Sequence, residues 1–146
     1  MDIELTKNSG VHTHVVFRQA SRTISLNSGN AVKAAGLTPT QFGILDVLYC
    51  LGDKTVSQIK AKILGTSGNL TVVLKNMERD GLIKRQTSQD DKRSYLFSIT
   101  DQGRRVFEAV LPQHRAELEN LYSIYSQEER QTLIALLKKF KPLSEG

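Results

Sequence analysis

The chain has 146 residues, of which 39% are hydrophobic, 24% are charged and 3 are proline. This balance excludes a disordered or low-complexity chain, and no apolar run approaches the ~18–20 residues that cross a bilayer. The N-terminal segment is acidic and no apolar signal core follows it, so we expect a cytoplasmic protein without a membrane partner. The single cysteine, Cys50, excludes an internal disulfide and a multi-cysteine metal site.

The formal net charge of +5 is unevenly distributed. Residues 38–105 carry 11 basic and 7 acidic groups, whereas residues 106–146 carry 5 basic and 6 acidic groups. A basic centre indicates an anionic partner that the middle of the chain meets. A charge of +5 is common on a domain of this size, however, and by itself it favours nucleic acid only slightly.

The first ~35 residues have the weak apolar periodicity of a helix, interrupted at residues 27–30. A second helix restarts at Thr38, which is followed by proline at the first helical position and by Gln41 three residues on, a capping box. Its apolar side chains recur at i, i+3, i+4 and i+7, and Gly52 ends it. This pattern predicts an amphipathic helix that packs on a core.

Two shorter helices follow. Thr55 and Gln58 form a second capping box, and Gly65 ends that helix. Thr66 then caps a third helix, predicted over about 67–79, whose apolar stripe precedes Gly81. Two helices joined by a tight turn that contains glycine predict a helix-turn-helix.

The period then changes to that of strands. The runs 82–87 and 94–99 read as a hairpin, and a charged, glycine-free loop joins them. Thr100 caps a long helical region, and Ser126, with Glu129 three residues on, caps a last helix. We therefore predict a mainly α fold with a small β-hairpin wing. It divides into an N-terminal helical region (1–37), a winged helix-turn-helix domain (38–103) and C-terminal helices (104–146).

In a winged helix-turn-helix the third helix enters the major groove and the wing, here 88–94, reaches phosphate or the minor groove. Asn69 is suited to an adenine contact, Thr71 or Val72 to a thymine methyl group, and Gly68 to close backbone approach. The remaining candidates are phosphate ligands at the helix start and cations on the helix and hairpin: Thr66, Ser67, Lys75, Lys84, Arg85, Lys92 and Arg93. Each alone also fits an ordinary solvated position, and only their ordered combination is specific.

From Leu37 to about Phe107 the sequence resembles the MarR-type (multiple antibiotic resistance regulator) transcription factors. The segments that carry the resemblance are Leu37-Thr38-Pro39-Thr40-Gln41-Phe42-Gly43-Ile44-Leu45, then Asn69-Leu70-Thr71 on to Met77-Glu78-Arg79-Asp80-Gly81-Leu82-Ile83, and Asp91-Lys92-Arg93 on to Ser98-Ile99-Thr100-Asp101-Gln102-Gly103. The resemblance implies an obligate homodimer on a pseudo-palindromic operator with half-sites about one helical turn (~34 Å) apart. It assigns dimerisation to the N-terminal region (1–37) and the C-terminal helices (104–146), and DNA binding to the winged domain (38–103). It also implies that Arg93 enters the minor groove and that Asp91 supports it.

Two positions depart from the family pattern. Ser67 stands where a basic residue is frequent, and Lys92 replaces the usual arginine before the diagnostic one. Many members bind a phenolic or other small amphipathic effector, and others sense oxidants through a cysteine. Cys50 does not match the position of that cysteine, and we expect a buried, inert thiol.

We expect no metal and no cofactor. His12 and His14 are two residues apart and so point to different faces of a helix, whereas a metal pair prefers i and i+4. His114 lies on an apolar stripe and reads as a packed or interface residue.

The sequence thus predicts a dimeric, sequence-specific DNA-binding regulator, a repressor that a ligand relieves. The alternative is a winged-helix module that binds protein and has no specific DNA partner; such a module does not need the hairpin cations. An enzyme is disfavoured, because the sequence has no Ser/His/Asp set, no phosphate-binding glycine loop and no H-E-x-x-H motif.

Overall fold

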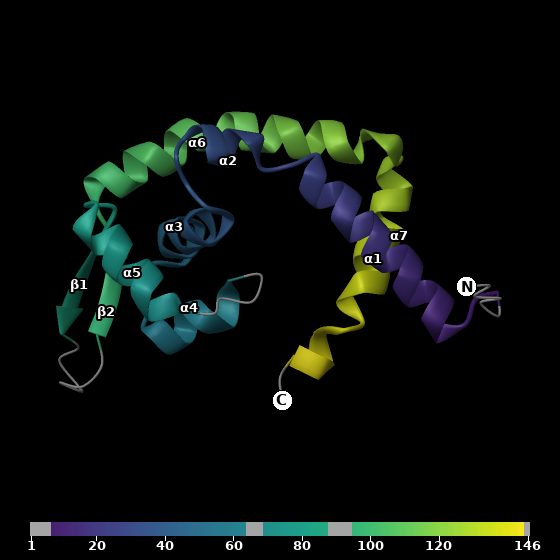
Figure 1. Cartoon of the computed structure of the whole chain (residues 1–146), viewed down its shortest axis with the longest axis horizontal. Coiled ribbons are helices and arrows are strands. Elements are labelled where there is room, and N and C mark those ends of the chain that lie inside the picture. The colour runs from purple at the N-terminus through teal and green to yellow at the C-terminus, as the bar shows by residue number, and fades with distance from the viewer. Residues whose placement is uncertain (1–6, 64–68, 88–94, 145–146) are drawn as a thin grey trace. The chain divides into compact units, whose positions relative to one another are not determined.

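A computed structural model of the chain describes residues 7–63, 69–87 and 95–144. It is mainly helical with one two-stranded hairpin, which confirms the predicted fold class (Figure 1). The chain forms two compact units, one of residues 29–114 and one of residues 1–28 with 115–146. We call them the winged unit and the arm unit. The predicted functional division at residues 37 and 103 stays a prediction.

The winged unit contains α2 (Asn30–Ala34), α3 (Pro39–Leu51), α4 (Val56–Lys62), α5 (Leu70–Arg79), β1 (Ile83–Thr87), β2 (Tyr95–Ile99) and the first part of α6 (Asp101–Leu121). Both predicted capping boxes are present. Thr38 and Gln41 exchange side-chain and backbone hydrogen bonds at the start of α3, and Thr55 and Gln58 do so at the start of α4. These local contacts define where each helix begins.

Helix α5 begins later than predicted. Its N-cap is Asn69, whose Oδ1 accepts from the Val72 N–H at 3.4 Å, so the prediction that Thr66 caps it is wrong. Asparagine is among the strongest N-caps, and glycine at position 68 disfavours a helix that starts earlier. Helix α5 ends at Arg79, and Gly81 follows with φ +79°, the glycine predicted to stop the helix. The Leu82 N–H donates to the Met77 carbonyl at 3.0 Å.

Strands β1 and β2 pair antiparallel, from Ile83 opposite Ile99 to Thr87 opposite Tyr95. This pairing confirms the predicted hairpin. Sequence reasoning missed a third backbone segment at this sheet. Lys54 exchanges two backbone hydrogen bonds with Phe97, at 3.1 and 2.9 Å. A single-residue bridge has no alternating pattern, so no periodicity signal could have revealed it.

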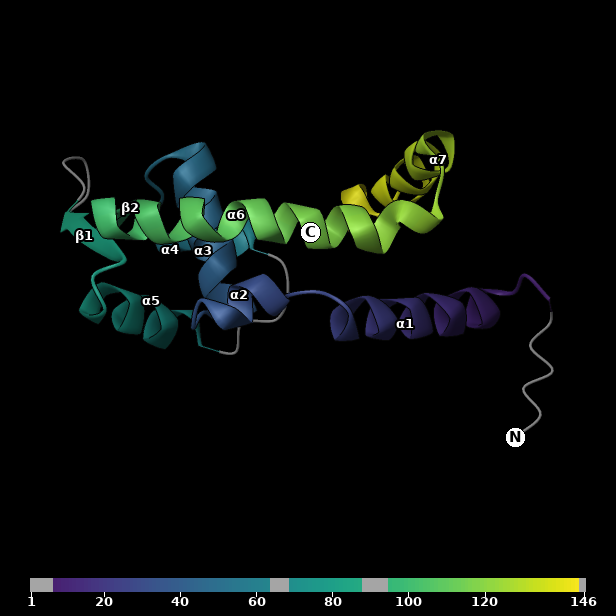
Figure 2. The same cartoon turned by 90° about the horizontal axis from the view of Figure 1, so that it is seen from above.

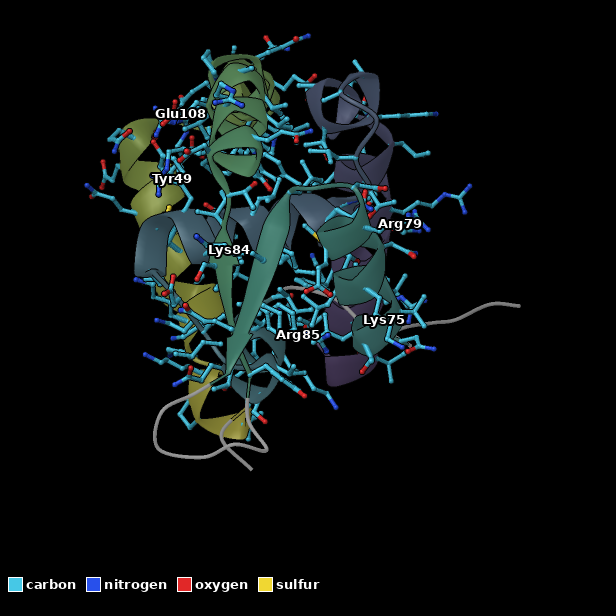
Figure 3. The ribbon with its side chains drawn as sticks, turned by 90° about the vertical axis from the view of Figure 1, so that its left-hand side faces the viewer. Tyr49, Lys75, Arg79, Lys84, Arg85 and Glu108 are labelled. Carbon is cyan, nitrogen blue, oxygen red and sulfur yellow. The ribbon has the colours of Figure 1, made fainter. Side chains whose placement is uncertain are left out.

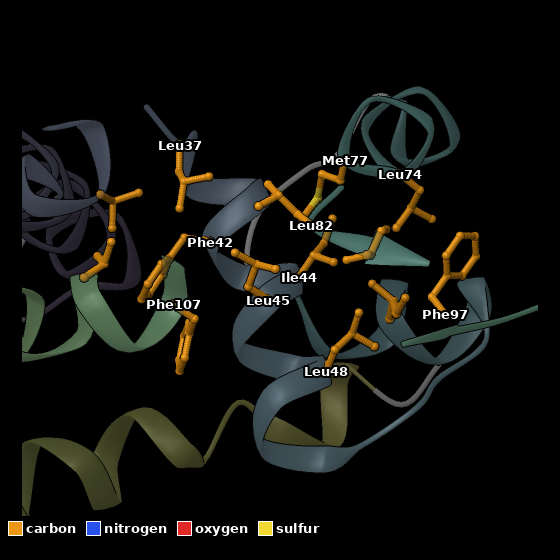
Figure 4. Packing of buried hydrophobic residues seen from close by; sticks show 14 of the residues in the cluster. Leu37, Phe42, Ile44, Leu45, Leu48, Leu74, Met77, Leu82, Phe97 and Phe107 are labelled. Carbon is orange, nitrogen blue, oxygen red and sulfur yellow. The ribbon is translucent and has the colours of Figure 1, made fainter. Parts of the chain in front are cut away.

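One hydrophobic core lies between α3, α5, the hairpin and α6 (Figure 4). Its centre is made of side chains that are almost fully buried: Ile44, Leu45, Ile59, Leu74, Met77, Ile83 and Phe107. The ring of Phe42 stacks on Phe107 with centroids 5.2 Å apart and contacts His114 at 4.7 Å. These contacts join α3 to α6 within the winged unit.

Cys50 is not part of this core. The thiol is exposed and Sγ donates to Asp46 Oδ1 at 3.3 Å, so the prediction of a buried thiol is wrong. The apolar neighbours Tyr49 and Leu51 suggested burial, but Leu51 is itself exposed at the end of α3, where the core no longer covers the helix.

The arm unit contains α1 (Gly10–Leu26), the last part of α6, η1 (Tyr122–Ile124), α7 (Gln127–Lys138) and η2 (Lys141–Ser144) (Figure 2). Ser126 and Glu129 form the predicted capping box of α7. Arg130 of α7 donates to Glu119 Oε2 at 2.9 Å and to the Tyr122 carbonyl at 3.1 Å. Among the helices that the structure describes, none is long and apolar enough to cross a membrane.

The helices of the arm unit expose their apolar faces. No residue of α1, η1, α7 or η2 is buried, and Phe140 and Leu26 are 64% and 71% exposed. A groove of about 730 Å³ separates α1 from the end of α6 and α7, lined mainly by apolar side chains that include Phe17, Ile24 and Leu137. The arm unit therefore lacks a core of its own.

Candidate nucleic-acid interface

Helix α5 has one buried face and one exposed face. Leu70, Leu74 and Met77 are buried, whereas Thr71 and Lys75 are exposed. Val72 also lies on the exposed face, and 47% of it is accessible to solvent. Its methyl groups are therefore accessible for an apolar contact such as that with a thymine methyl group.

Asn69 stands at the start of this exposed face. Its Oδ1 is occupied by the cap bond to Val72, which fixes the amide at the N-terminus of α5. The amide Nδ2 is a donor that the cap does not use, so Asn69 can serve as the helix cap and still donate to an acceptor outside the helix.

Polar residues at the C-terminal end of α5 contact one another. Arg79 Nε lies 3.2 Å from Asp80 Oδ1, and Arg79 Nη1 donates to Asn76 Oδ1 at 3.3 Å. The guanidinium therefore lies along the C-terminal turn of α5, while Lys75 projects one turn earlier (Figure 3). Asp80 offsets part of the charge of Arg79, so Lys75 is the clearer cation for a phosphate on this face.

The two adjacent cations of β1 point to opposite sides of the hairpin. Arg85 lies between the hairpin and α5, and Lys84 lies on the other side of β1 (Figure 3). The prediction treated them as one pair of cations, whereas successive strand residues alternate between faces. Only Arg85 shares a side with α5, where its Nε lies 3.6 Å from Glu78 Oε2.

Several predicted contact residues lie outside the described residues: Thr66, Ser67, Gly68, Asp91, Lys92 and Arg93. The structure thus exposes Thr71, Val72 and Lys75 on α5 and Asn69 at its N-cap. The DNA-contact roles of all the candidate residues stay predictions.

A polar contact that sequence reasoning missed joins α3 to α6. The Tyr49 hydroxyl donates to Glu108 Oε1 at 2.8 Å, and the Arg104 guanidinium lies 5.1 Å from the centre of the Tyr49 ring (Figure 3). The hydrogen bond to the Glu108 carboxylate raises the pKa of the Tyr49 phenol above its ordinary 10.0, so the phenol keeps its proton near neutral pH. The partners are 59 positions apart in the sequence, so no local pattern could have linked them.

Potential metal ligands do not gather in the described part of the chain. His12 Nδ1 accepts from the Asn8 N–H at 3.3 Å, and His14 is exposed on α1. Among the residues described, no three of the types His, Cys, Asp and Glu are grouped so as to hold a metal ion.

The sequence and the fold both match known regulators. The model of the MarR family matches residues 37–95. The chain is 36% identical to the uncharacterized HTH-type transcriptional regulator YkoM of Bacillus subtilis, over 85% of this chain and 80% of that protein. It is 34% identical to the HTH-type transcriptional regulator MhqR of the same species, over 86% of each.

Solved structures show the same fold. A mutant MarR from E. coli, crystallised with operator DNA, superposes with a TM-score of 0.76, covering 93% of this chain and 97% of that one at 22% identity. The family match spans α3, α4, α5 and β1 and ends at the first residue of β2, so it includes the helix whose exposed face is described above. Dimerisation and relief by a ligand are typical of this family. The chain belongs to the MarR family of transcriptional regulators.

Proposed function

We propose that the chain binds a pseudo-palindromic operator as a homodimer and represses transcription until a small amphipathic or phenolic effector releases it. Helix α5 enters the major groove, and the wing at 88–94 meets the minor groove with Arg93, supported by Asp91. The protein works in the cytoplasm by binding and does not catalyse a reaction.

The exposed face of α5 carries this proposal. Thr71, Val72 and Lys75 project from a helix whose opposite face is buried in the core, so the helix is held rigidly and presents small, polar and cationic groups outwards. Small and polar side chains allow a helix to approach base edges closely, and a cation one turn later can meet phosphate.

The arm unit supports the homodimer. Its helices bury no residue by themselves, and they leave large apolar side chains such as Phe17, Leu26 and Phe140 exposed in one protomer. A second copy would cover the apolar groove and bring a second winged unit to the other half-site.

The decisive experiment is a fluorescence-anisotropy titration of a labelled duplex from the region upstream of the protein's own gene against a scrambled duplex of equal length. We expect the upstream duplex to bind at least ~10³-fold more tightly, with an affinity that falls steeply as salt rises. Equal affinity for both duplexes would contradict the operator proposal. Absence of DNA binding, together with specific capture of a protein, would favour the alternative interaction module.

Replacing Lys75 with glutamine tests the phosphate role of the exposed α5 cation. We expect weaker binding to operator and scrambled duplexes in the same proportion, and a salt slope smaller by about 1, because one counterion-releasing contact is lost. Lys33→Gln, on α2, makes the same charge change at another exposed position and should leave the slope unchanged. A loss confined to the operator duplex would instead assign Lys75 to base recognition.

A further inference from the structure

Besides the shared hydrophobic core, a charged side chain joins the hairpin to α5 at the surface. Arg85 of β1 places Nε 3.6 Å from Glu78 Oε2 of α5, and its guanidinium carbon lies 4.6 Å from the ring centre of Tyr95 on β2. From β1, Arg85 thus contacts both the paired strand and α5. We call Arg85, Glu78 and Tyr95 the hairpin clasp.

The clasp lies next to the short turn that joins α5 to β1, near which the angle between α5 and the hairpin is determined. Only Asp80, Gly81 and Leu82 connect α5 to β1, and the backbone hydrogen bonds of Gly81 and Leu82 to Glu78 and Met77 hold this turn. Beyond the turn, the position of the strands relative to α5 depends on side chains. Arg85 is the third residue of β1 and lies on the side that faces α5 (Figure 3).

The chemistry of the clasp explains an acidic residue at this surface. A carboxylate on a recognition helix repels phosphate, so Glu78 by itself opposes DNA binding. The Nε edge of the Arg85 guanidinium is directed at that carboxylate, and its face lies over the Tyr95 ring. An ion pair and a cation–π contact are both favourable interactions of a guanidinium. The Glu78 carboxylate offsets part of the Arg85 charge, which makes Arg85 a weaker phosphate ligand than an unpaired cation.

We propose that Arg85 is a positioning residue of the DNA interface: through Glu78 and Tyr95 it holds the strands of the hairpin at a fixed angle to α5, and it does not itself bind phosphate. The inference rests on the proposed DNA-binding function. Two elements that must reach DNA together bind more tightly when their relative placement is set in advance, because less freedom is lost on binding.

The test compares Arg85→Gln, Glu78→Gln, the double variant and the control Lys84→Gln by anisotropy with the operator duplex at several salt concentrations. We expect Arg85→Gln to weaken binding by about three- to tenfold with an unchanged salt slope. Glu78→Gln should also weaken binding, by about two- to fivefold, although it removes a negative charge from the surface. The double variant should bind no worse than Arg85→Gln, because both changes break the same contact.

The control variant removes a positive charge from Lys84, the residue next to Arg85 in β1. Lys84→Gln removes the same positive charge from β1 on the side away from α5, and should alter affinity by less than Arg85→Gln does (Figure 3). Thermal unfolding of all four variants checks that the fold is intact, which the partial exposure of both clasp charges leads us to expect.

Two results would overturn the positioning role. The first is that the Glu78→Gln variant binds the operator duplex more tightly than the wild type while the salt slope of Arg85→Gln is smaller by about 1. That result would show that Arg85 is a phosphate ligand. The other is wild-type affinity in every clasp variant. Both require that the wild-type protein binds the operator duplex, so they are distinct from a failure of the proposed function, in which the wild-type protein itself shows no sequence preference.

Discussion

Replacing Gly103 with alanine is expected to destabilise the winged unit by about 2–4 kcal/mol, the largest stability effect that we expect from a single methyl group in this chain. A Cβ at this position would overlap the carbonyl oxygen of Leu82 and lie 3.0 Å from Ile99 Cγ1. The carbonyl cannot simply move away, because it accepts the backbone N–H of Thr100 at 3.1 Å.

The same corner is held by a second set of bonds. The Thr100 hydroxyl donates to the Gly81 carbonyl at 2.6 Å and accepts from the Gly103 N–H at 2.9 Å. The end of α5, the end of β2 and the start of α6 therefore meet at one point, and a shift of any one disturbs the other two.

Urea denaturation followed by circular dichroism measures this effect. Gly10→Ala is the matched control, because Gly10 opens α1 and has open space around its Cβ position. We expect the control to be neutral or slightly stabilising, since alanine is the better helix former. If the two variants had equal stability, the close approach at Gly103 would not be a constraint in solution.

Replacing Leu137 with aspartate is expected to weaken dimerisation by at least about 100-fold and to reduce operator affinity with it. Leu137 lies on α7, lines the apolar groove of the arm unit and is 41% exposed in the single protomer. If a second copy covers this groove, the substitution places a charge without a partner in an apolar interface, which costs about 3 kcal/mol or more. A monomer then engages one half-site only and loses the gain from simultaneous binding.

Sedimentation velocity over a dilution series gives the oligomeric state, and anisotropy with the operator duplex gives the affinity. Gln131→Asp introduces the same aspartate at an exposed polar position of α7 that does not line the groove. This control should remain dimeric and bind normally. A Leu137→Asp variant that stays dimeric at the concentrations where the wild type does would show that this groove is not the interface.

Contacts within a few residues of one another could be predicted from the sequence. The capping boxes at Thr38, Thr55 and Ser126 are confirmed because each needs only a residue and its neighbour three positions later. The prediction of where α5 starts was wrong for a local reason as well. Thr66 and Asn69 are both residue types that can cap a helix, and the sequence pattern alone does not rank two possible N-caps within one turn.

Contacts between distant segments could not be predicted. No sequence pattern links Tyr49 with Glu108 or Lys54 with Phe97, although each pair is in contact in the structure. The exposure of Cys50 has the same origin, since burial depends on which elements cover the end of α3. Even Arg85 and Glu78, seven positions apart, meet only because the turn at Gly81 folds β1 back along α5.

Length, charge distribution and motif order were thus enough to establish a mainly helical chain with a basic winged centre, because helix periodicity, capping and turn chemistry are local properties. The tertiary structure decided which cation of β1 faces α5 and which polar residues at the end of α5 form hydrogen bonds with one another. It also decided that helices α1 and α7 bury no side chain within a single protomer. Those properties depend on how separate elements pack, and packing is set by the whole chain rather than by any short stretch of it.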